Sequence, residues 1–127
     1  MLRILLASTD KDSLFDLKTG FEEGGAQIVW AVTCGDIFLR LKEEKFDLIV
    51  IDEKLPEMNG LECIEKLIYL NPMLNCASIS SLSPDEFHEA SEGLGLLMQL
   101  PEKPDKEDAL KLLDHLKIIL NLTKKVS

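Results

Sequence analysis

Five short apolar segments alternate with segments of helical periodicity, and this alternation constrains the fold more than any other feature of the sequence. The apolar segments cover residues 2–7, 28–32, 47–51, 76–80 and 96–100. Apolar runs of this length are typical of strands, and strands that alternate with helices are typical of parallel sheets joined by right-handed crossovers. The sequence therefore predicts an α/β fold: a doubly wound, five-stranded parallel sheet with helices on both faces.

Local signals mark the ends of several intervening helices. Gly24 and the glycine after it follow the first helical segment, as glycines past a helix end do. Thr33, with Asp36 three residues later, has the spacing of a capping box, and Ser83 is followed by proline at the first helical position. Pro101 lacks an N–H donor, so the fifth strand is expected at an edge of the sheet.

Composition excludes several classes of protein. The chain has 127 residues, enough for one compact domain. It carries 14 Lys and Arg against 23 Asp and Glu, a net charge of −9 that repels phosphate backbones, so a direct nucleic-acid partner is not expected. No apolar run approaches the roughly 20 residues that cross a bilayer. A cytoplasmic protein without a membrane partner is predicted.

The cysteines do not have the spacing of a metal site. Cys34, Cys63 and Cys76 form no C-x-x-C pair, and their number is odd. They are therefore predicted to be apolar packing residues in a reducing compartment, in preference to zinc ligands.

Ligands of doubly wound sheets bind beyond the carboxyl ends of the strands, and polar residues gather there in this sequence. The residues that follow the first, third, fourth and fifth strands are Ser8, Thr9, Asp10, Asp52, Ser80, Ser81 and Lys103. A carboxylate can attack phosphorus to form an acyl phosphate, hydroxyls can donate to phosphoryl oxygens, and an ammonium group can offset their charge. The sequence therefore predicts a site that holds a phosphoryl group.

The motifs at these positions resemble those of a known family. An apolar strand ends in Asp52, Pro56-Glu57-Met58-Asn59-Gly60 follows it, and Lys103-Pro104 precedes the last helix. Over residues 2–121 the chain resembles the receiver domain of bacterial two-component response regulators. The resemblance implies a flavodoxin-like strand order of 2-1-3-4-5, a cis Lys103–Pro104 bond, a receiver-like domain over residues 1–122 and a short polar tail over 123–127.

The same resemblance implies roles for individual residues. Asp52 corresponds to the phosphoacceptor, Lys103 to the family's lysine, and Ser81 (or Ser80) to the switch hydroxyl. The implied partners are a sensor histidine kinase or small phosphodonor and a downstream protein. The domain is expected to be a signalling module rather than an enzyme, and to exist as a monomer or weak dimer.

The sequence departs from the family at the metal site. Ser8 and Thr9 stand where receivers carry an acidic pair that holds Mg²⁺. The remaining candidate ligands are Asp52, Asp10 and the backbone carbonyl of Lys54, so a weakened Mg²⁺ site is predicted. Asp10 has a second interpretation, as a helix cap. The side chain of Lys54 has two interpretations: a solvated loop residue, or a cation beside the acceptor.

Three functions follow from these features. The first is a receiver that accepts a phosphoryl group on Asp52 and then changes a protein-binding face. The second is a pseudo-receiver that acts through protein binding without phosphorylation, which the missing acidic pair favours. The third is a flavodoxin-like flavin carrier with Ser8, Thr9 and Ser13 as its phosphate loop, although that loop lacks glycine and contains Asp10 and Asp12.

Overall fold

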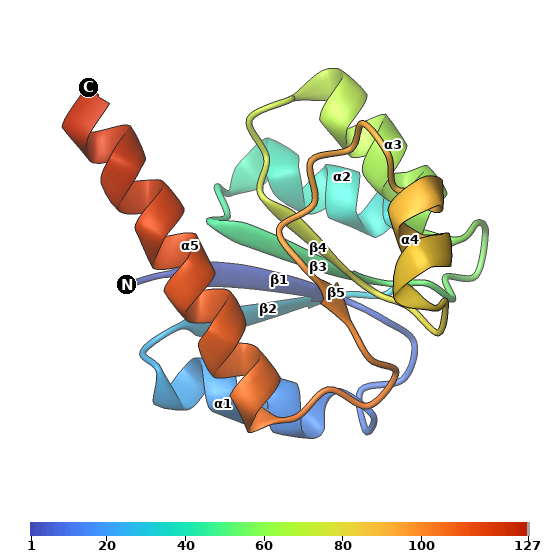
Figure 1. The fold of residues 1–127 in the computed structure, drawn as a ribbon, viewed down its shortest axis with the longest axis horizontal. Coiled ribbons are helices and arrows are strands. Elements are labelled where there is room, and N and C mark those ends of the chain that lie inside the picture. The colour runs from blue at the N-terminus through green and yellow to red at the C-terminus, as the bar shows by residue number, and fades with distance from the viewer. Residues whose placement is uncertain (127) are drawn as a thin grey trace.

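The computed structural model describes the backbone of residues 1–126 and the side chains of residues 1–121. It contains one parallel sheet with the strand order β2-β1-β3-β4-β5, as predicted (Figure 1). The strands are β1 (Arg3–Ala7), β2 (Gln27–Ala31), β3 (Leu48–Asp52), β4 (Cys76–Ile79) and β5 (Gln99–Leu100). The fifth strand lies at the edge of the sheet, as Pro101 indicates, but it is only two residues long.

Helices cover both faces of this sheet (Figure 1). They are α1 (Phe15–Glu23), α2 (Cys34–Glu43), α3 (Gly60–Leu70), α4 (Pro84–Ala90) and α5 (Lys106–Val126). Helices α1 and α5 lie on one face, and α2, α3 and α4 on the other. Among the described residues, no helix has the length and apolar character to cross a bilayer.

The core forms two layers because successive side chains of a strand point to opposite faces. Ile4 and Leu6 of β1 pack in the layer beneath α1 and α5, whereas Leu5 and Ala7 pack beneath α2 and α3. All four are fully buried. The central strand β1 is thus apolar on both faces, as its unbroken apolar run predicts.

The predicted caps of α2 and α4 are confirmed. The Thr33 hydroxyl accepts a hydrogen bond from the backbone N–H of Asp36 at 2.9 Å and begins α2. Ser83 and Glu86 form a complete capping box at α4, with proline at the first helical position. Helix α1 begins only at Phe15, after a turn that starts at Lys11.

The C-terminal helix is longer than the sequence pattern indicates. It extends to Val126, so the backbone of 123–126, assigned above to a polar tail, is helical. Residue 127 lies outside the described part of the chain.

The prediction of three packing cysteines is wrong for two of them. Cys34 and Cys63 form a disulfide that joins the first turns of α2 and α3, with the Cα atoms 5.8 Å apart. Their separation of 29 residues in the sequence hides this proximity, which arises only when the two helices pack side by side. Cys76 is a free, buried thiol, and burial raises its pKa to about 12.

Candidate functional site

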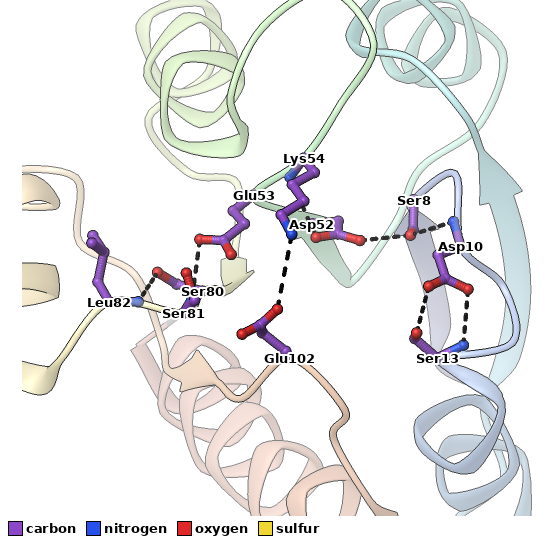
Figure 2. Close-up of polar contacts among 10 residues, drawn as sticks. All are labelled: Ser8, Asp10, Ser13, Asp52, Glu53, Lys54, Ser80, Ser81, Leu82 and Glu102. Carbon is purple, nitrogen blue, oxygen red and sulfur yellow. Dashed lines mark hydrogen bonds and ion pairs between the residues drawn. The ribbon is translucent and has the colours of Figure 1, made fainter.

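Asp52 is the centre of the site. It ends β3, a strand flanked by β1 and β4, and therefore lies at the carboxyl edge of the sheet where the strand order reverses. Its carboxylate is half-buried and hydrogen-bonded on both oxygens. Oδ2 accepts from the Ser8 hydroxyl at 2.7 Å, and Oδ1 accepts from the backbone N–H of Lys54 at 3.3 Å (Figure 2).

Ser8 directly follows β1 and is almost completely buried, at 1% exposure. Its hydroxyl donates to Asp52 and accepts a hydrogen bond from the backbone N–H of Asp10 at 2.9 Å. The hydroxyl therefore has a fixed orientation, with its proton directed at Asp52. The sequence placed Ser8 at this edge of the sheet, but only the structure reveals its direct contact with Asp52.

The carboxylate of Asp10 is directed away from Asp52 and toward Ser13 (Figure 2). One oxygen accepts from the Ser13 backbone N–H at 3.2 Å, and the other from the Ser13 hydroxyl at 2.5 Å. These two bonds hold the pKa of Asp10 below its usual value, and the nearby positive charge of Lys103 lowers it further. These bonds close the turn before α1 and do not cap the helix, because α1 begins at Phe15 with Leu14 at its N-cap and no side-chain cap. The second interpretation of Asp10, as a helix cap, is therefore wrong.

The side chain of Lys54 lies on the surface. It is 79% exposed, and its ammonium group is 4.0 Å from a carboxylate oxygen of Glu102. Such an exposed pair contributes little to stability. It nevertheless links the loop after β3 to the loop after β5 across the mouth of the site (Figure 2).

Lys103 lies at the same edge of the sheet but does not contact Asp52 directly. Its side chain is exposed, and within the described residues its ammonium group forms no ion pair. The Lys103–Pro104 bond is not cis, because the described chain contains no cis peptide bond; the expectation from the resemblance is wrong here. The trans form is the lower-energy isomer even before proline.

Glu53 is a residue that the sequence analysis missed. Strand alternation turns its side chain away from Asp52, toward the loop after β4 (Figure 2). One carboxylate oxygen accepts from the backbone N–H of Ser81 at 3.0 Å, and the other is buried with no hydrogen-bond partner. Glu53 thereby holds the loop that carries both candidate switch hydroxyls. The position directly after a strand-end aspartate was the available signal.

The two candidate hydroxyls are not equivalent. Ser80 is buried, and its hydroxyl accepts from the backbone N–H of Leu82 at 3.2 Å. Ser81 is exposed and contacts Glu53 through its backbone. Both serines line a hollow of about 390 Å³ beside Glu53 and Lys54.

The loop between β3 and α3 is fixed next to Asp52. The backbone N–H of Gly60 donates to the carbonyl of Glu53 at 3.0 Å, and Asn59 caps α3 by accepting from Glu62 at 2.9 Å. A Cβ atom at Gly60 would overlap the carbonyl oxygen of Asp52, so only glycine allows this approach.

Comparison with known proteins identifies the family of the chain. The family model described as the response regulator receiver domain matches residues 4–114. The chain belongs to the response regulator receiver family. Receiver domains are signalling modules of two-component systems that interact with sensor kinases and downstream effectors.

The curated relatives of this receiver domain include a receiver protein and a much longer sensor kinase. The response regulator receiver protein CpdR of Brucella abortus is 32% identical over 90 residues, which are 67% of this chain and 75% of that protein. The autoinducer 2 sensor kinase/phosphatase LuxQ of Vibrio parahaemolyticus is 31% identical over 114 residues, 86% of this chain but only 13% of LuxQ.

Solved structures agree on the fold. A CheY-like receiver domain protein from Methanospirillum hungatei superposes with a TM-score of 0.79 at 27% identity and covers 100% of this chain and 99% of that one. A two-component response regulator from Clostridium difficile gives a TM-score of 0.82 at 21% identity, covering 95% and 99%.

Receiver domains generally bind Mg²⁺ at an acidic pocket, and the residues present here fit that ion poorly. Ser8 is neutral and its hydroxyl is bonded to Asp52, while both oxygens of Asp10 are bonded to Ser13. Within the described residues no group of three Asp, Glu, His or Cys side chains has the arrangement of a metal site. Of the predicted ligands, Asp52 and the Lys54 carbonyl thus remain, and Mg²⁺ prefers more charge than this.

Proposed function

We propose that this receiver domain accepts a phosphoryl group on Asp52 from a sensor histidine kinase or small phosphodonor, and that the acyl phosphate then changes a protein-binding face. The observation that carries the proposal is the Asp52 carboxylate itself. It is half-buried at the carboxyl end of a central strand and is oriented by donors on two sides. An oriented carboxylate is a competent nucleophile toward phosphorus.

The step is a phosphoryl transfer. One carboxylate oxygen of Asp52 attacks phosphorus, the bond between phosphorus and the donor breaks, and the donor leaves with that electron pair. The Ser8 O–H and the Lys54 N–H already point at the carboxylate, so they can donate to the charge that arrives. The exposed Lys103 ammonium group at the same edge forms no ion pair within the described chain, so it can offset part of the phosphoryl charge.

The response requires two packings of the same domain that differ by a few kcal/mol. Ser80 and Ser81 lie on the loop that Glu53 fastens to the end of β3. A phosphoryl group on Asp52 competes for the donors around this loop, and movement of the loop carries the change to α4. A downstream protein that binds one packing more tightly then reads the phosphorylation.

The second candidate function is a pseudo-receiver that binds a protein without phosphorylation. The hydrogen bond between Ser8 and Asp52 favours it, because a neutral residue takes the place of charge that would recruit a metal ion. In this case the packing described here is the active one.

Acetyl phosphate separates the two functions. The protein is incubated with this donor at several Mg²⁺ concentrations and without the ion, and then weighed intact by mass spectrometry. An adduct that is absent in Asp52→Asn but present in the control variant Asp16→Asn, on the surface of α1, supports phosphorylation at Asp52. The absence of an adduct under every condition, in protein of native circular dichroism, contradicts it and leaves the pseudo-receiver.

A further inference from the structure

The Cys34–Cys63 disulfide holds the start of α3, at the far end of the loop that follows Asp52. Cys34 is the first residue of α2, and Cys63 lies in the first turn of α3. Both cysteines are buried, at 2% and 0% exposure. The disulfide therefore ties the start of α3, where the loop ends, to a neighbouring helix.

A second contact fastens the same loop to the same helix. The backbone N–H of Cys34 donates to a carboxylate oxygen of Glu57 at 2.6 Å, and Glu57 lies in the middle of the loop. The loop's other end is held by Asp52, whose Oδ1 accepts from the Lys54 N–H. The loop, residues 53–59, is thus attached to α2 both directly and through the disulfide.

We propose that the Cys34–Cys63 disulfide is a reversible clamp on residues 53–59, and that the oxidation state of these two cysteines sets how readily Asp52 takes up a phosphoryl group. The second half of the proposal rests on the function proposed above. With the disulfide closed, the Lys54 N–H stays aimed at the acceptor. With the disulfide open, α3 is released from α2, the loop loses its fixed position, and phosphoryl transfer becomes slower.

The chemistry is thiol–disulfide exchange with a dithiol. The dithiol gives up two electrons and two protons and becomes a cyclic disulfide, while Cys34 and Cys63 become thiols. Oxidation by a disulfide of the glutathione class runs the exchange in reverse. Cys76 does not compete, because its raised pKa keeps it protonated.

Two measurements on the full chain test the clamp. The first is amide hydrogen exchange of residues 53–59, compared between oxidised protein, protein reduced with dithiothreitol, and the double variant Cys34→Ala/Cys63→Ala. The second is the rate of adduct formation from acetyl phosphate in the same samples. Cys76→Ala is the matched control, and alkylation in denaturant counts the free thiols.

The clamp predicts that oxidised protein alkylates at Cys76 alone and that reduced protein alkylates at all three cysteines. It also predicts several-fold faster exchange of the loop amides and several-fold slower adduct formation after reduction and in the double variant, with Cys76→Ala like the parent. Unchanged loop exchange, equal adduct rates, or three free thiols after oxidant treatment would overturn it.

Failure of the proposed function gives a different result. If no sample forms an adduct, Asp52 is not an acceptor under these conditions, and the loop exchange alone then decides whether the disulfide holds the loop. Protein that loses its native circular dichroism on reduction has lost its fold globally, which also counts against a local clamp.

Discussion

At the scale of single residues, the pairing of Asp52 with Ser8 distinguishes this site. A hydroxyl satisfies one carboxylate oxygen without adding charge, whereas an acid at the same position would add charge and recruit a cation. The buried position of Ser8 and its second bond, from the Asp10 N–H, show that the hydroxyl is built into the loop after β1.

Restoring acids at these positions should restore a metal site. The double variant Ser8→Asp/Thr9→Asp is expected to bind Mg²⁺ about tenfold more tightly or better, because the ion's affinity rises with the number of carboxylate ligands. Calorimetric titration measures the affinity. The control is Ser13→Asp, which adds charge to the same loop beside Asp10 but away from Asp52. An affinity that does not rise, or that rises equally in the control, contradicts the placement of the site.

Sequence reasoning placed Asp52 at the carboxyl edge of the sheet because it directly follows a buried strand, and the resemblance to receivers supplied its predicted role. It did not find the contacts of Glu53, since that side chain bonds to a backbone group 28 residues away on another loop. A backbone partner that is distant in the sequence leaves no local pattern. A long-range backbone contact also decides between Ser80 and Ser81. The backbone N–H of Ser80 donates to the carbonyl of Leu100 in the short strand β5, and this bond fixes Ser80 as the buried serine.

At the scale of elements, α1 and α5 approach closely through a glycine. A Cβ atom at Gly20 would lie 2.7 Å from the Cβ of Ala109 and 3.1 Å from the Cα of Lys106. Gly20 therefore sets the spacing of the helix pair on this face, and the cost of its low helix propensity is offset by the contact that it permits.

Gly20→Ala tests this spacing. Alanine improves helix propensity by about 1 kcal/mol, but overpacking costs about 1–3 kcal/mol, so a net loss of unfolding free energy is expected. Urea denaturation measures it. Gly35→Ala in α2 is the matched control, because its new Cβ would meet only the Thr33 hydroxyl at 3.8 Å; it should be neutral or stabilising by up to about 1 kcal/mol. A stabilised Gly20→Ala variant would show that the helices can separate freely.

At the scale of the whole molecule, the fold was predictable and the cross-link was not. The apolar runs predicted strands, and β1 and β3 read correctly as central because they are apolar on both faces. The strand order came from the family resemblance, since periodicity alone does not order strands. The disulfide depends on how α2 and α3 pack against each other, which no local pattern encodes.

The cross-link should stabilise the entire domain. A disulfide that closes a loop with a sequence separation of 29 lowers the conformational entropy of the unfolded chain. In the chain-entropy model this raises the free energy of the unfolded state by about 3–4 kcal/mol. Reduction with dithiothreitol should therefore lower the unfolding free energy of the parent protein by about this amount, measured by urea denaturation. Cys34→Ala is the control, because its stability should be the same with and without the reductant. A parent protein insensitive to reduction would contradict the cross-link.

The absence of a side chain at Gly60 has a mechanical consequence. The first residue of α3 rests directly on the carbonyl of Asp52, backbone against backbone. Side chains can change rotamer and absorb a displacement, but two backbones in contact cannot. A shift of the strand end would therefore be passed to the start of α3, whose opposite end carries the exposed side chains of Tyr69 (87%) and Leu70 (69%).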